Sequence, residues 1–226
     1  ETMNNRSIRY PRGKTLGGSS SINGLLYIRG QSRDYDIWRQ LGNNGWGWDD
    51  VLPYFIKAEN QERGKDEFHG IGGPLSVSDQ RIQLPLLNEF QNAAEEFGIP
   101  KTKDFNTGNN YGCGYFQVTE KDGFRCSTAV GYLNPIKTRK NLHIVTNAHV
   151  KKINFENKIA KEVEYWQGNE LKKITSNKEI ILSSGSIGSP QILQTSGIGN
   201  SQKLKDLGIE MVQELKGVGE NLQDHL

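Results

Sequence analysis

The chain of 226 residues carries 28 lysine and arginine residues against 26 aspartate and glutamate residues, a formal net charge of +2. This balance gives no electrostatic support for binding nucleic acid or another polyanion. Apolar residues make up 34% of the chain and charged residues 24%. No apolar run approaches the roughly 18 residues of a membrane-spanning helix, so we expect a globular protein without a transmembrane segment. Two cysteines and four unclustered histidines predict neither a disulfide framework nor a metal site.

Glycine is the one over-represented residue. The 26 glycines are about 11.5% of the chain, against a usual level of roughly 7%. They indicate many points where the backbone turns tightly or approaches something closely. The chain begins at Glu1 and ends at Leu226 inside a motif-like stretch, so we expect it to be an internal piece of a longer protein.

The first half of the chain predicts an extended entry over residues 1–12, followed mainly by helices. Apolar residues at helical spacing, with capping residues or glycine at the ends, predict helices at 34–42, 49–58 and 85–97. Alternating residues at 75–78 predict a short strand. The segment 101–124, rich in Asn, Gly and Tyr, is predicted to be a long loop that binds a ligand, forms a lid or lacks order.

The second half predicts a helix at 127–137 and then mainly strands. Strand-like runs occur in five places, at 142–146, 150–155, 160–166, 171–175 and 179–182. Short helices are expected at 189–195, with Pro190 in the first turn, and at 203–207. The mixture predicts a mixed α/β fold with a largely antiparallel sheet and helices.

The nucleotide-binding motifs of the sequence are incomplete. Residues 13–15 read as the end of a P-loop, but Ile8 stands where its first glycine belongs. The Gly-x-Gly pairs at 197–199 and 217–219 both lack the third glycine of a dinucleotide fingerprint. Neither an NTP site nor a complete dinucleotide loop is therefore predicted.

Ser186 is the centre of a near match to the nucleophile elbow of hydrolases, between a predicted strand and a helix. Ser184 replaces the first glycine of that pattern, and no histidine follows before His225. A serine hydrolase remains a minor alternative.

The segment 13–30 is the most informative part of the sequence. The paired glycines 17–18 remove two side chains in succession, so a flat ligand can lie against bare backbone. Serines 19–21 supply hydroxyl groups and N–H donors, and Asn23-Gly24 leads the chain into an apolar run that can cover a planar ring. Taken alone, the segment also fits an ordinary Gly/Ser turn before a buried element.

The order of several motifs resembles the glucose-methanol-choline (GMC) family of FAD-dependent alcohol oxidoreductases. The residues 13–30 resemble its first signature, and 184–199 resemble its second. Further matching stretches occur in the expected order, at 123–129, 132–133, 141–150 and 217–225. The resemblance covers nearly the whole chain and is strongest to choline and related alcohol dehydrogenases.

The resemblance implies roles for individual residues. Thr15 matches a backbone contact to the flavin, and Val150 matches a position whose backbone meets the adenine of FAD. Four residues match the segment beside the isoalloxazine ring, namely Asn23, Gly24, Leu25 and Leu26. Family members with covalent FAD carry a histidine where this chain has Ile22, so non-covalent FAD is expected.

The resemblance also implies a reaction and a division of the chain. A GMC enzyme transfers hydride from an alcohol to flavin, and its base is a histidine of a C-terminal segment. His225 is not that base, so no catalytic residue is expected here, and the piece alone is expected to be inactive. Choline-like or other primary alcohols are the expected substrates, with oxygen or a quinone-type carrier as electron acceptor. The expected divisions are a flavin-covering segment (1–73), a substrate-domain segment (74–142) and a return to the FAD domain (143–226).

Alternatives remain at two levels. One alternative is a catalytically inactive binding module that keeps the flavin fold. The aromatic residues Trp38, Trp46, Trp48 and Tyr54 form either a packed helix–loop–helix core or a cage for a quaternary ammonium ion. Arg29 and Arg125 pair either with carboxylates inside the protein or with flavin phosphates.

Overall fold

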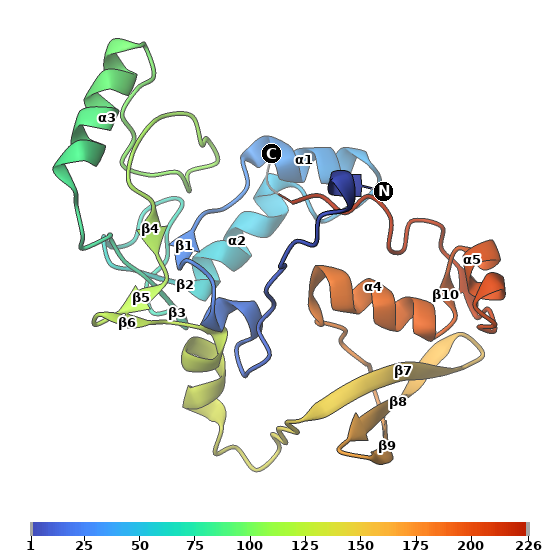
Figure 1. Ribbon diagram of the computed structural model, residues 1–226. Coiled ribbons are helices and arrows are strands. Elements are labelled where there is room, and N and C mark those ends of the chain that lie inside the picture. The colour runs from blue at the N-terminus through green and yellow to red at the C-terminus, as the bar shows by residue number, and fades with distance from the viewer. Residues whose placement is uncertain (1, 225–226) are drawn as a thin grey trace. The chain divides into compact units, whose positions relative to one another are not determined.

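Residues 2–224 are described by a computed structural model, shown in Figure 1. The chain separates into two compact units, residues 1–142 and 143–226. Helices and strands occur in both units, which confirms the predicted mixed α/β fold. None of the described helices is long and apolar enough to span a bilayer.

The first unit contains three α-helices, and all three were predicted. They are α1 (Ser32–Gln40), α2 (Trp48–Ala58) and α3 (Pro85–Glu96). Each of the first two begins with a carboxylate that accepts a backbone N–H bond: Asp34 Oδ2 accepts from Gln31 N at 2.7 Å, and Asp50 Oδ2 from Gly47 N at 3.0 Å. These acceptors satisfy donors that the first turn of a helix leaves free.

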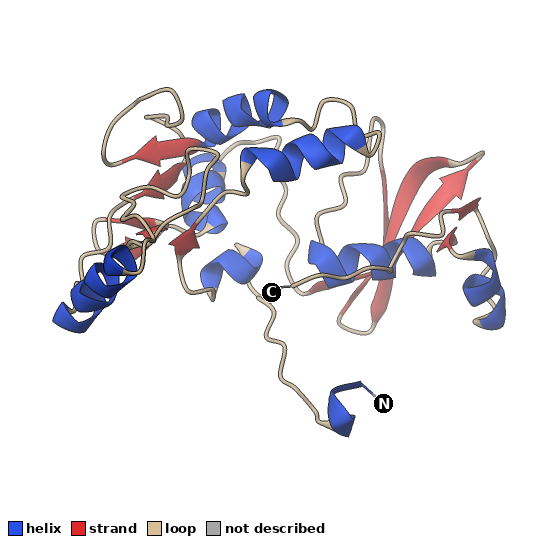
Figure 2. Cartoon of the chain, turned by 90° about the horizontal axis from the view of Figure 1, so that it is seen from above, coloured by secondary structure: helices blue, strands red, loops and turns tan. Residues whose placement is uncertain are grey.

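The strands of the first unit are short, as the separate red arrows in Figure 2 show, and one of the pairs joins segments that lie far apart in the sequence. The antiparallel pairs are β1 (Leu26–Tyr27) with β4 (Gln117–Val118) and β5 (Glu120–Lys121) with β6 (Phe124–Arg125), and the parallel pair is β2 (Glu59–Gln61) with β3 (Leu75–Val77). The prediction of a structureless loop over 101–124 was therefore wrong in its second half. That half supplies strand partners for residues far away in the chain.

The predicted helix at 127–137 is not an α-helix. A π-helical turn covers Ala129–Leu133, and a 3₁₀ turn covers Asn134–Ile136. Pro135 has no N–H to donate to a regular α-helical ladder. Gly131 packs closely against Pro74, so that a Cβ on Gly131 would lie 2.4 Å from the carbonyl oxygen of Pro74. Tertiary contact therefore overrides helical propensity in this stretch.

The second unit is built on an antiparallel meander of three strands, β7 (Ala148–Glu156), β8 (Ile159–Gln167) and β9 (Glu170–Thr175). The helix α4 (Gly185–Thr195) packs against β7, as Figure 1 shows. Its C-terminal end is tied to that strand, because Thr195 Oγ1 donates to Lys151 O at 3.0 Å and Ile153 N donates to Ser196 Oγ at 2.8 Å. Ile153 on β7 and Ile192 on α4 are both buried.

The remaining elements of the second unit are short. They are β10 (Ile198–Gly199), paired in parallel with β11 (Gln213–Glu214), and α5 (Ser201–Asp206). The side chain of Asn200 caps α5 by accepting from the backbone N–H groups of Gln202 and Lys203, both at 3.1 Å.

Two predicted strands of the second half are absent. Residues 142–146 and 179–182 form no strand in the described part of the chain. A strand depends on a hydrogen-bonding neighbour, and neither segment pairs with another described segment. The helix predicted from 189 starts four residues earlier, at Gly185, so Pro190 lies inside it.

Candidate functional site

The turn at residues 13–18 has a conformation that requires glycine. Gly17 and Gly18 have φ angles of 89° and 54°, in the left-handed region. A Cβ on Gly13 would lie 2.1 Å from the carbonyl carbon and oxygen of Gly18. The turn closes when Gly18 N donates to Thr15 O at 2.9 Å. The glycines noted in the sequence therefore let the backbone cross itself closely, and a 3₁₀ turn follows over Gly18–Ser21.

Five of the six predicted cofactor-binding residues lie in this turn or in the segment that follows it, up to Leu26. Thr15, Asn23 and Gly24 are exposed, and Leu26 is 51% exposed at the start of β1. Leu25 is half-buried with a φ of 68°, an unusual angle for a residue with a side chain. The sixth residue, Val150, belongs to β7 of the second unit.

Main-chain groups of the segment are open in the way a flat ligand requires. A Cβ placed on Gly24 would have no atom within 4 Å, so the backbone there is bare. Among the described residues, no acceptor is found for the N–H groups of Thr15 and Gly24. Two free donors, a bare glycine and a half-exposed leucine together fit a planar, heteroatom-rich ring system.

The segment is held from behind by residues about 100 positions further along the chain. Thr128 N donates to Ser20 Oγ at 2.9 Å, and Thr128 Oγ1 donates to Gly17 O at 3.2 Å. A Cβ on Gly17 would come within 3.2 Å of both Ser127 Oγ and Ala129 Cβ. The turn therefore fits tightly against 127–129 on one side and is open on the other.

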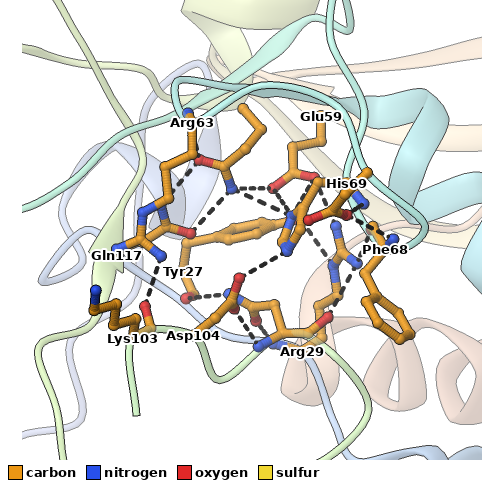
Figure 3. A network of polar contacts seen from close by, with 12 residues as sticks. Tyr27, Arg29, Glu59, Arg63, Phe68, His69, Lys103, Asp104 and Gln117 are labelled. Carbon is orange, nitrogen blue, oxygen red and sulfur yellow. Dashed lines mark hydrogen bonds and ion pairs between the residues drawn. The ribbon is translucent and has the colours of Figure 1, made fainter.

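A buried network of charged side chains lies just past the segment, and Figure 3 shows its members converging. Arg29 is 3% exposed and Glu59 is 0% exposed, and they form an ion pair of 2.8 Å. His69 lies between two carboxylates, with Nδ1 3.0 Å from Glu59 Oε2 and Nε2 2.8 Å from Asp104 Oδ2. Two cations and two anions thus balance one another, and all but the partly exposed Asp104 are shielded from water.

The same network fixes the strand that leaves the candidate segment. Arg29 N donates to Asn106 Oδ1 at 2.7 Å, and Asn106 Nδ2 donates to Tyr27 O at 3.4 Å. Asn110 Nδ2 donates to Arg29 O at 3.0 Å. The polar loop that the sequence suggested as a ligand-binding lid is therefore bonded to the backbone on the C-terminal side of β1.

Electrostatic contacts set the protonation of the network. Burial alone lowers the pKa of His69, but the carboxylates of Asp104 and Glu59 outweigh it and raise that pKa to about 9. Burial opposes the charge of Asp104, whereas His69 and the backbone N–H of Asn106 stabilise it, and the pKa of Asp104 is lowered. The imidazolium form of His69 is therefore favoured near neutral pH.

Sequence reasoning found Arg29 but none of its partners. The interpretation of Arg29 as an internal ion pair is confirmed, whereas Glu59, His69 and Asp104 were not singled out. These residues are separated by ordinary loop and helix sequence and follow no spacing rule. The only signal of a buried charge was an arginine directly after an apolar strand, in the run Tyr27-Ile28-Arg29-Gly30.

Val150 borders a cavity of about 410 Å³ inside the second unit. The strands β7 and β8 form one side of this cavity, and α4, from its N-cap Ser184 to its last residue Thr195, forms the other. Its lining includes His149, Val150, Trp166, Ser184, Gly188 and Ile192. The lining thus combines an aromatic ring, aliphatic side chains and a glycine with polar and charged groups such as His149 and Lys151.

The aromatic residues of α1 and α2 contact one another rather than forming an empty cage. Trp38 packs edge-to-face on Tyr35 with centroids 5.4 Å apart, and on Trp46 at 6.0 Å. Trp48 lies 5.8 Å from Tyr35, and Tyr54 is 72% exposed without a ring partner among the described residues. The rings therefore form a contacting aromatic cluster, but Trp38 is 46% and Trp46 54% exposed, so the cluster is not a buried core.

Neither a hydrolase site nor a metal site is found in the described part of the chain. Ser186 is exposed in the first turn of α4, and no described histidine lies within hydrogen-bond distance of its hydroxyl group. His225 lies outside the described residues. No group of three or more potential ligands among residues 2–224 could hold a metal ion.

The whole chain matches one family model, that of GMC oxidoreductase, over residues 1–226. The chain belongs to the GMC oxidoreductase family.

Relatives and solved structures agree with this assignment. The chain is 45% identical to an alcohol dehydrogenase [acceptor] of Pseudomonas putida, over 99% of this chain and 41% of that protein. It is 44% identical to an oxygen-dependent choline dehydrogenase of Vibrio vulnificus, over 99% of this chain and 40% of that protein. An FAD-dependent oxidoreductase from Chaetomium thermophilum matches with a TM-score of 0.92 and 35% identity, over 98% of this chain and 41% of that one. The chain thus spans about two fifths of the length of these relatives.

Proposed function

We propose that the protein containing this chain is an FAD-dependent oxidoreductase that converts an alcohol to an aldehyde. One observation carries the proposal: in a member of the GMC family, the signature segment presents the bare backbone of Gly24 beside free N–H groups and the half-exposed Leu26. Bound FAD supplies the acceptor for the hydride that leaves the carbinol carbon. This chain supplies the surface that holds and covers it.

Five residues of the first unit are proposed to hold the isoalloxazine end of FAD. The N–H groups of Thr15 and Gly24 have no acceptor among the described residues, so both are available to ring heteroatoms. Asn23 and Leu25 shape the backbone around Gly24, and Leu26 provides an apolar side chain that excludes water. Preorganised backbone donors of this kind stabilise negative charge on a bound group.

Val150 is proposed to contact the adenine end. The cavity beside it has a volume of about 410 Å³ and is lined by strand backbone, Trp166 and α4. This supports an adenine-sized occupant. Ile22 cannot form a bond to the flavin, since its side chain has no heteroatom, so we propose that FAD is held without a covalent link.

The substrate is proposed to be choline or another primary alcohol, with oxygen or a quinone-type carrier as electron acceptor. The names of the two curated relatives support both substrate classes. No residue of this chain is assigned as the catalytic base, so the 226 residues alone are proposed to be inactive. The proposed divisions remain a flavin-covering segment (1–73), a substrate segment (74–142) and a further FAD-domain segment (143–226).

The test uses the full-length protein. We expect stoichiometric FAD in its absorbance spectrum, release of all the yellow colour on acid precipitation, and bleaching by a primary alcohol under anaerobic conditions. Choline and benzyl alcohol, compared at equal concentration, distinguish the two substrate classes. Flavin that no alcohol reduces would favour the inactive binding module, and colourless protein would refute the proposal.

A further inference from the structure

Arg125 connects two parts of the first unit that lie about 100 residues apart in sequence. It is half-buried on β6, and its Nη1 donates to Ser20 O at 3.1 Å and to Asn23 Oδ1 at 2.7 Å. Unlike Arg29, it has no carboxylate partner among the described residues. A structural ion pair therefore does not account for its position, and both acceptors belong to the candidate segment.

The contact with Arg125 determines which way the side chain of Asn23 faces. Asn23 Oδ1 accepts both from Arg125 Nη1 and from the backbone N–H of Leu25 at 3.2 Å. A reversed amide would place its NH₂ group against two donors and lose both bonds. The oxygen is thus committed to the protein, and Nδ2 keeps its two hydrogens without an acceptor among the described residues.

We propose that Arg125 is a positioning residue for the flavin, acting through Asn23. It holds the Asn23 carboxamide so that Nδ2 and the neighbouring N–H of Gly24 form a pair of donors for acceptor atoms of the isoalloxazine ring. The inference rests on the proposed function, because it requires FAD at this segment. Arg125 lies on β6, outside the first signature, so the spacing of residues within that signature does not reveal this role.

The first part of the segment is held by a second set of contacts, which does not involve Arg125. Thr128 bonds Ser20 Oγ and Gly17 O, so the first part of the segment is fixed independently of Arg125. Loss of the guanidinium would therefore free Asn23 and Leu25 locally and leave the turn at Gly17 in place. Small errors in the position of a group at a reaction site reduce rates by large factors.

The experiment compares Arg125→Met, Arg125→Lys, Asn23→Ala and the double variant in the full-length protein. Methionine keeps the length of the side chain without its donors, whereas a lysine ammonium group can still donate to both acceptors. We expect Arg125→Met to accelerate amide hydrogen exchange at residues 22–25 by at least about tenfold. We expect it to slow flavin reduction by about 10- to 100-fold. Arg125→Lys should restore part of both effects.

The double variant tests whether Arg125 acts through Asn23. If it does, the rate of flavin reduction in the double variant should be no lower than the rate in Asn23→Ala alone. Lys121→Met is the control, since Lys121 lies on the same hairpin, is exposed and makes no polar side-chain contact with the segment in the described part of the chain. It should leave exchange and reduction rates unchanged.

Three results would overturn the inference: unchanged exchange at 22–25 in Arg125→Met, an unchanged rate of flavin reduction, or fully additive effects in the double variant. Failure of the proposed function is a separate result. In that case the wild-type protein would contain no flavin at all, and the exchange measurement would then decide whether Arg125 orders Asn23.

Discussion

The segment 13–26 and the buried network around Arg29 are neighbours in sequence, but different forces hold them. Glycine conformations, close backbone contacts and neutral hydrogen bonds determine the segment, and most of its predicted ligand-binding residues are exposed. The network consists of four charged groups, and the Arg29–Glu59 pair at its centre is almost fully buried. The segment has an open side, whereas the network holds the backbone that follows it.

This difference predicts opposite responses to mutation. Changes to exposed side chains of the segment should affect ligand binding more than folding. Changes to the network should affect folding first, because a buried charge that loses its partner remains in a medium that solvates it poorly.

Glu59→Gln should be the most destabilising change. It keeps the volume of the side chain but leaves the guanidinium of Arg29 and the imidazolium of His69 without the carboxylate between them. Loss of one partner of a buried ion pair costs about 3–5 kcal/mol in the free energy of unfolding. Urea unfolding followed by tryptophan fluorescence measures this change.

The matched control is Glu95→Gln in the same unit. Glu95 forms an exposed ion pair of 2.9 Å with Lys101, and such pairs contribute about 0–1 kcal/mol. Equal destabilisation by the two variants would show that burial does not distinguish the network.

The network should also make stability depend on pH on the alkaline side. His69 has a folded-state pKa of about 9, above the value of about 6.5 expected in the unfolded chain. Its contribution is therefore complete below about pH 6.5, decreases as the pH rises, and is lost above about pH 9. The shift corresponds to an effect on the order of 3 kcal/mol.

Urea midpoints measured between pH 6 and 9.5 test this dependence. His69→Gln should remove most of the alkaline decrease, whereas His143→Gln, at an exposed position, should keep it. An NMR titration that places the pKa of His69 near 6.5 would contradict the assignment of the charged form.

Two glycines of the segment separate structural from functional roles. Gly13→Ala should destabilise the protein by about 1–3 kcal/mol, because the new methyl group would overlap the carbonyl of Gly18. Gly24→Ala has open space for its methyl group and should change stability by less than about 0.5 kcal/mol. The same methyl group should weaken FAD binding, which fluorescence titration measures. If Gly24→Ala lowered stability but left FAD affinity unchanged, the result would show that FAD does not bind beside Gly24.

The sequence predicted those parts of the fold whose determinants are local. Helices α1 to α3 follow from apolar spacing and from residues near their ends, such as Asp34, Asp50 and Gly98. The long meander follows from alternation and from its tight turns. The residues 142–146 and 179–182 have the composition of strands, but their pairing depends on partners that composition does not specify.

The candidate site divides in the same way. Residues 13–26 could be identified from the sequence because the glycines and the turn that they form lie within one continuous segment. The contacts of Arg125 with Asn23, and of Asp104 with His69, join residues 35 to 102 positions apart. No periodicity connects such residues, so only the folded chain shows that they meet.

The smallest predicted effect concerns the support behind the segment. Thr128→Val removes one hydroxyl group, and with it the bonds to Gly17 O and Ser20 Oγ, while shape is nearly conserved. These bonds are neutral and partly exposed to water, so the expected loss is about 1 kcal/mol. Thr138→Val, at an exposed hydroxyl group that has no partner among residues 2–224, serves as the control. The bonds of Thr128 lie on the side of the turn that packs against 127–129. Flavin affinity should therefore decrease no more than the stability of the turn decreases. A decrease in affinity much larger than the decrease in stability would mean that the hydroxyl of Thr128 contacts the ligand, and the division between an open and a supported side would then be wrong.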